Sequence, residues 1–186
     1  VRMNGILTGV YLFPHPPIMI PEIGGAETSK CGATVNGARA AAAALAAGNL
    51  DTVIIVSPHG TMFRDGPCFL DGERLLGDFG QFGCPQIRFL EGNDTDTLSL
   101  ITEELKKDSL EYVCMDDGIA ARYHRERTLD HGFMVPFYFI REAWKSGQVI
   151  SITYGFQNGD MQYRVGRAVR RAIDRSGKRI AFVCSG

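Results

Sequence analysis

Apolar runs alternate with amphipathic stretches along the chain and divide it into predicted strands and helices. Continuous or loosely alternating apolar residues predict strands at residues 5–13, 51–57, 86–90, 111–115, 148–154 and 179–184. Apolar residues at helical spacing predict helices within residues 27–48, 93–108, 133–144 and 160–175. This alternation predicts an α/β fold, a three-layer sandwich around a mostly parallel central sheet.

The connections between these elements add detail to the prediction. The first strand, an alanine-rich helix before Gly48 and the second strand are typical of a right-handed crossover between a parallel pair. The helix at 93–108 implies a second crossover, from strand 86–90 to strand 111–115. Residues 61–85 are rich in glycine and are expected to form loops and a hairpin over one edge. Pro136 fits the first turn of a buried helix.

Composition limits the class of protein. The chain has 186 residues, 45% of them hydrophobic, and is long enough for one domain with a core, so we expect residues 1–186 to form a single domain. Its 20 basic and 21 acidic residues give no charge pattern for binding nucleic acid or a membrane surface. No apolar run approaches the about 18 residues that span a bilayer, and no signal peptide is recognised, so a cytoplasmic location is expected. Five cysteines without a Cys-x-x-Cys pair indicate reduced thiols.

Two histidines stand where predicted strands end at a proline. His15 lies in the segment Pro14-His15-Pro16-Pro17, and His59 lies in Ser57-Pro58-His59-Gly60. Ligands of open α/β sheets bind at the carboxyl ends of strands, because loops diverge and helix N-termini point there. His131 would lie at the start of a predicted helix, so we expect all three histidines on one rim. His124 lies in a charged segment and is expected to be solvated.

Several roles remain open for these histidines. Two imidazoles and one carboxylate form the facial triad of non-haem Fe(II) oxygenases. Glu22, Asp65 and Asp130 are candidate carboxylates, but no spacing selects one of them. Each histidine alone fits a structural hydrogen-bonding role equally well. Asp130 is consistent with a helix cap that orients either a structural or a catalytic His131.

Together these segments resemble a known family. Residues 14–24, 57–60, 129–136 and 181–186 are similar to the B-subunit family of class III extradiol ring-cleavage dioxygenases, in the branch shared with Memo-like and AmmeMemoRadiSam proteins. The resemblance implies that His15 and His59 bind Fe(II) or another divalent metal. It also implies a small catechol-type aromatic substrate and dioxygen, with catalytic roles for His131 as a hydrogen-bond donor and for Asp130 in orienting it.

The resemblance also defines what this chain does not contain. In the family, the Ser-Gly that ends the last strand continues into an Asp-x-Ser-His segment with an acid/base histidine, and a later carboxylate completes the metal site. This chain stops at Gly186, so we expect a domain truncated after its last strand. Some members of the branch have lost ligands. The alternative function is therefore a non-catalytic Memo-like metal-binding module in a radical-enzyme or signalling pathway, and homo-oligomerisation stays open.

Overall fold

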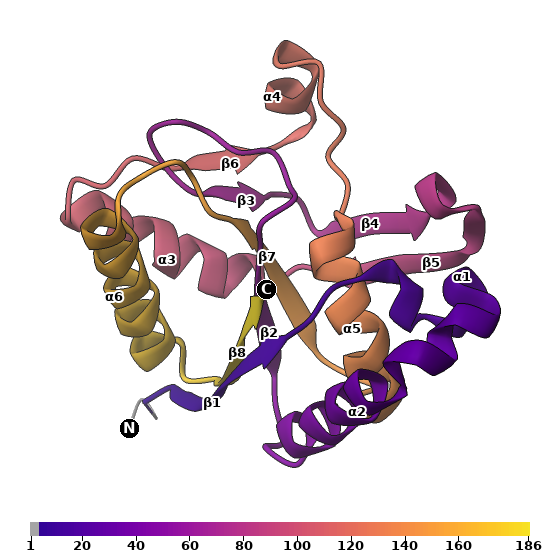
Figure 1. Cartoon of the computed structure of the whole chain (residues 1–186). Coiled ribbons are helices and arrows are strands. Elements are labelled where there is room, and N and C mark those ends of the chain that lie inside the picture. Colours follow the sequence, from indigo (N-terminus) through magenta and orange to yellow (C-terminus); the bar gives the residue numbers. More distant parts are fainter. Residues whose placement is uncertain (1–3) are drawn as a thin grey trace.

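Residues 4–186 are described by a computed structural model, and within them a central sheet organises the chain (Figure 1). Its strands lie in the order β1 (Ile6–Phe13), β8 (Arg179–Ser185), β2 (Thr52–Ser57), β7 (Gln148–Thr153), β3 (Cys68–Leu70) and β6 (Val113–Met115). Neighbouring strands run parallel, except that β3 is antiparallel to β7. The predicted α/β fold with a mostly parallel sheet is confirmed.

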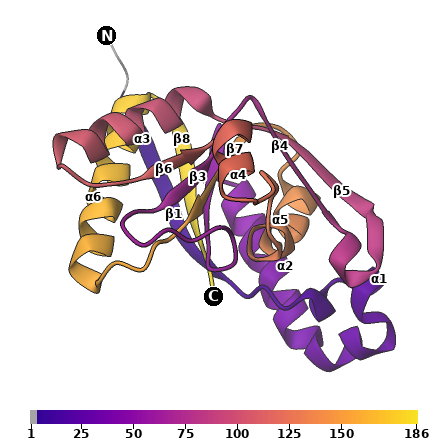
Figure 2. The same cartoon turned by 90° about the horizontal axis from the view of Figure 1, so that it is seen from above.

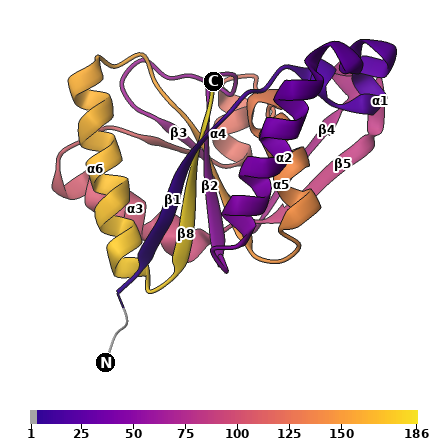
Figure 3. The ribbon, with the colours of Figure 1, turned by 60° about the horizontal axis from the view of Figure 1, so that its bottom comes forward.

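Helices cover both faces of this sheet and produce three layers. The helices α2 (Gly32–Ala46) and α5 (His131–Ala143) lie on one face, and α3 (Thr95–Lys107) and α6 (Gly159–Ser176) lie on the other (Figure 3). Val53 and Ile55 of β2 belong to the first core, whereas Ile54 between them belongs to the second. A strand buried on both faces needs apolar side chains at every position, which explains the uninterrupted run in β2.

The strand order corrects one expectation. β1 and β2 run in the same direction, but they are not neighbours, because β8 lies between them and pairs with both. Ile180, Ala181 and Val183 of β8 are all fully buried. The last strand thus takes an interior position that buries both of its faces, and the predicted direct pairing of β1 with β2 is wrong.

The expected second crossover is also wrong. The predicted strand at 86–90 forms β5 (Cys84–Gly92), which pairs antiparallel with β4 (Arg74–Phe79) outside the central sheet (Figure 2). Only one side of β5 is buried. Ile87 and Phe89 lie on that side, whereas Arg88 and Leu90 lie on the other side and are exposed. A strand inside a parallel sheet is buried on both faces. The β4–β5 hairpin instead lies beside α5.

The start of α5 differs from the prediction as well. The side chain of Asp130 accepts hydrogen bonds from the backbone N–H groups of Gly132 (2.8 Å) and Phe133 (3.3 Å), so the helix begins at His131. Pro136 therefore lies in the second turn, where it removes one helical hydrogen bond, and not in the first turn. The predicted burial of this helix is confirmed, since Phe133, Phe137 and their neighbours are almost inaccessible.

Shorter elements complete the description. They are the 3-10 helices η1 (Pro17–Met19), η2 (Gly25–Cys31) and η3 (Gly80–Phe82) and the helices α1 (Pro21–Gly24) and α4 (Asp117–Arg122). Among residues 4–186, no helix combines the length and the apolar character needed to cross a membrane.

An ion-pair network joins α3 to α6. Glu104 of α3 is 4% exposed and accepts hydrogen bonds from Lys107, Arg171 and Arg175. The hydrogen bonds from Lys107 and Arg171, and to a smaller extent the one from Arg175, lower the pKa of Glu104 to about 2. They outweigh the effect of burial, which raises this pKa. A buried carboxylate is thereby kept charged at the helix interface.

Candidate metal centre and adjoining cavity

The carboxyl ends of β1 and β2 meet the N-terminus of α5 at one rim of the sheet. His15 follows β1, His59 follows β2, and His131 is the first residue of α5. Their ring centroids lie 4.7 Å apart for His15 and His59, 4.1 Å for His59 and His131, and 5.9 Å for His15 and His131. The predicted convergence of the three histidines is confirmed. His124 is exposed in the connection after α4, with a left-handed backbone (φ 52°).

The closest approach in this cluster has the geometry of a metal site. Nε2 of His15 lies 2.9 Å from Nε2 of His59. Two nitrogens bound to one ion at about 2.1 Å and at right angles would lie about 3.0 Å apart. One nitrogen from each of the three histidines fits within a span of 4.8 Å. The residues present therefore fit a divalent metal, with His15 and His59 as the closest pair.

A serine orients the His15 ring. Ser185, at the end of β8, has its Oγ 3.0 Å from His15 Nδ1. When Nδ1–H donates to this oxygen, the lone pair of Nε2 is left free on the side that faces His59. Metal-binding histidines characteristically donate their second ring N–H in this way, which fixes both tautomer and orientation.

Burial favours the neutral form of two of the rings. Burial, and next the neighbouring His59, lowers the pKa of His15, while Asp130 acts in the opposite direction. Burial and His59 likewise lower the pKa of His131, again against Asp130. A neutral imidazole is the form that can donate a lone pair to a metal.

The candidate carboxylates occupy different positions. Glu22 accepts a hydrogen bond from the Tyr138 hydroxyl at 3.1 Å, and Asp65 lies exposed in the connection between β2 and β3. Asp130 is the one of the three whose charge acts on the His15 and His131 rings. Its Oδ1 accepts from the backbone of α5 and from the Ser57 hydroxyl. Asp130 therefore fixes the start of the helix that carries His131.

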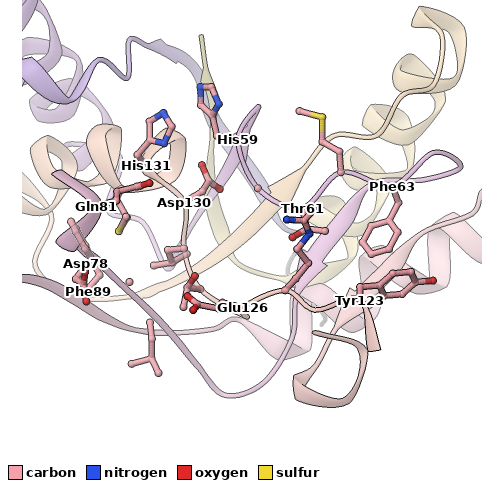
Figure 4. A pocket seen from close by; sticks show the side chains of 18 of the residues that line it. His59, Thr61, Phe63, Asp78, Gln81, Phe89, Tyr123, Glu126, Asp130 and His131 are labelled. Carbon is pink, nitrogen blue, oxygen red and sulfur yellow. The ribbon is translucent and has the colours of Figure 1, made fainter. Parts of the chain in front are cut away.

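A large cavity opens beside His59 and His131. Its volume is about 1270 Å³, above the roughly 300–1,000 Å³ of common small-molecule sites. Figure 4 shows His59 and His131 on one side and the paired rings of Phe63 and Tyr123 on another. Those two aromatic rings meet edge to face with centroids 5.1 Å apart. The cavity thus combines a histidine end with an aromatic wall.

Much of this wall could not be identified from the sequence. Gln81 comes from the tip of the β4–β5 hairpin, and Tyr123 and Glu126 come from the connection after α4. These segments have no regular spacing of apolar residues. The one signal in the sequence is Tyr123, an aromatic residue within a charged stretch. Phe63 lines the cavity, whereas Met19 belongs to the core.

Comparison with known proteins places the chain in a family. Residues 9–186 match the family described as the catalytic LigB subunit of aromatic ring-opening dioxygenase. The chain is also similar to Protein CA_C1420 of Clostridium acetobutylicum, with 34% identity over 180 residues, or 97% of this chain. It spans 38% of the length of that relative. The match over nearly all of its residues shows that the chain belongs to the LigB family.

Proposed function

We propose that the chain binds Fe(II) through His15 and His59 and takes part in extradiol ring opening of a catechol-type aromatic by dioxygen. The observation that carries this proposal is the 2.9 Å separation of the two Nε2 atoms, at the edge of a large cavity, in a LigB family chain. Non-haem Fe(II) in such a site supplies, when bound, open coordination positions for a catecholate and dioxygen.

The protein's own side chains would bind and orient the substrate. His131 faces the cavity, and Phe82 lies against it with ring centroids 5.5 Å apart. An imidazole held in this way can donate a hydrogen bond from a ring nitrogen to a substrate oxygen. Asp130 holds the first turn of α5 and so keeps His131 at the rim. The aromatic side chains of Phe63 and Tyr123 would contact the apolar part of the substrate.

One observation favours a second candidate function. The cluster of potential ligands found within residues 4–186 consists of three imidazoles and contains no carboxylate. A metal-binding module without ring-cleaving activity, such as a Memo-like one, needs the histidines but not the full facial triad. This alternative shares the metal site with the first proposal and differs from it in chemistry.

Metal content and oxygen uptake, measured on anaerobically purified protein, distinguish the two functions. The protein is loaded with Fe(II), its metal content is measured, and oxygen uptake is followed with a panel of catechols of increasing size. About one iron per chain with catechol-dependent uptake is expected. Stoichiometric iron without uptake on any catechol would leave only the binding module, and failure to bind iron, cobalt or zinc would remove both functions.

A further inference from the structure

Ser57, the last residue of β2, connects two of the histidine-bearing segments. It is completely buried, and its hydroxyl donates a hydrogen bond to Asp130 Oδ1. Ser57 Oγ also accepts a hydrogen bond from the backbone N–H of His59 at 3.2 Å. One hydroxyl therefore contacts both the loop that carries His59 and the residue that caps the helix carrying His131.

The two segments approach each other closely at this point. A β-carbon added to Gly132 would lie 2.4 Å from Ser57 Oγ and 3.1 Å from Pro58 Cδ. A real β-carbon does not approach so closely, so the contact depends on glycine at position 132. Directly beside it, the rings of His59 and His131 stack with an angle of 25° between their planes.

Neither element needs this hydrogen bond to form. β2 is paired on one side with β7 and on the other with β8. Asp130 already caps α5 through Gly132 and Phe133. The Ser57 hydroxyl fixes the end of β2 relative to the start of α5, because it bonds to the His59 backbone on one side and to the capping residue Asp130 on the other.

We propose that Ser57 is a positioning residue, which sets the separation of His59 and His131 through Asp130 and Gly132. The proposal rests on the proposed function only where it concerns metal affinity, since the position of the two rings can be measured without metal. Loss of the hydroxyl would leave Asp130 Oδ1 with its backbone partners but free the His59 loop to move relative to α5.

The test compares Ser57→Ala with Ser151→Ala, which removes another buried serine hydroxyl from the middle of β7, away from the histidines. Nitrogen resonances of the histidine rings are recorded by NMR in the metal-free proteins, and Co(II) affinity is measured by absorption. In Ser57→Ala, the His59 and His131 resonances should shift while those of the exposed His124 stay constant. Co(II) affinity should fall about 10- to 100-fold, as it does for lost outer-sphere partners.

Two further variants test the same contact in case Ser57→Ala does not fold. Ser57→Thr keeps a hydroxyl and should restore the ring resonances toward those of the wild type. Gly132→Ala pushes on the same contact from the helix side and should shift the same two rings. Shifted rings in Gly132→Ala together with wild-type-like rings in Ser57→Thr would support the positioning role even if Ser57→Ala is too unstable to study, and unchanged rings in Gly132→Ala would count against it.

The outcomes separate this proposal from the proposed function. If the wild-type protein binds no metal but Ser57→Ala shifts the ring resonances of His59 and His131, the positioning role is supported and the metal site is rejected. Unchanged His59 and His131 resonances, with Co(II) affinity equal to that of Ser151→Ala, would reject the positioning role and leave the metal site in place.

Discussion

His15 Nε2 lies 2.9 Å from His59 Nε2, although the two residues are 44 positions apart in the chain. β1 and β2 are not neighbours in the sheet, so the contact is made by the loops that follow them. Those loops leave the sheet on the same rim and turn toward each other above β8, which runs between the two strands.

This contact predicts the effect of removing either ring. His15→Ala and His59→Ala should each weaken Fe(II) or Co(II) binding by more than about 100-fold, because a direct ligand matters more than the outer partners that cost 10- to 100-fold. Metal content after dialysis measures the loss. The matched control is His124→Asn, since asparagine tolerates the left-handed backbone at that exposed position. Full iron content in both alanine variants would disprove the site.

The orientation of His15 leads to a second prediction. Ser185→Ala removes the group that contacts His15 Nδ1, so the ring can rotate and its tautomer is no longer fixed. Metal affinity should fall about 10- to 100-fold while the fold is retained. Titration with Co(II) measures the affinity, and Ser99→Ala on the exposed side of α3 serves as the control. An affinity within twofold of wild type would show that His15 holds its orientation without Ser185.

The aromatic wall predicts a preference for larger substrates. If Phe63 and Tyr123 contact the distal part of a catechol with an aryl substituent, Phe63→Ala or Tyr123→Ala should weaken its binding about three- to tenfold. Binding of unsubstituted catechol should change little. Equilibrium dialysis under anaerobic conditions gives both constants, and Tyr123→Phe retains the ring as a control. Equal losses for the small and the large catechol would argue against this wall as a substrate contact.

The α3–α6 network predicts a specific pH dependence of stability. Because the pKa of Glu104 is about 2 in the folded protein and near 4.5 when unfolded, ionisation stabilises the folded state. That contribution is complete above about pH 4.5 and is lost as the pH falls toward 2. Glu104→Gln should therefore lower the free energy of unfolding by about 2 kcal/mol at pH 7, with a smaller difference at pH 3.

Urea unfolding followed through the single tryptophan measures this effect. Trp144 is buried, and its indole N–H donates to the Leu50 carbonyl, so its fluorescence should report loss of tertiary structure. Glu103→Gln is the matched control, because Glu103 pairs with Arg175 at the half-exposed edge of the network. Its loss should cost less than about 1 kcal/mol. A Glu104→Gln difference that does not shrink in acid would contradict the role of the charge.

The sequence predicted those features that leave a local pattern. The apolar run of β2 follows from burial on both faces, and the positions of His15 and His59 follow from prolines that end strands. Strand order leaves no such pattern. β8 lies between β1 and β2 through contacts across more than a hundred residues. The apolar run within residues 179–184 indicates a buried strand but does not show which strands it pairs with.

The residues that position the histidines or line the cavity could not be predicted from the sequence for a similar reason. A serine at the end of a strand is unremarkable, and only the fold brings Ser57 against Asp130. Phe63 and Tyr123 lie in segments without periodicity, and their contact depends on how two loops cross the cavity. The roles of direct ligands could thus be proposed from residue type and position, whereas the residues that hold or surround them required the structure.

The β4–β5 hairpin stands outside the central sheet, and its tip contributes Gln81 to the cavity wall. Changes of length or sequence at this tip break no ladder of the sheet that carries His15 and His59. A substitution of Gln81 can therefore alter the cavity wall without changing a strand that leads to a histidine, whereas Phe82 beside it contacts His131. Gln81 is accordingly a position where the shape of the cavity can be varied separately from the central sheet.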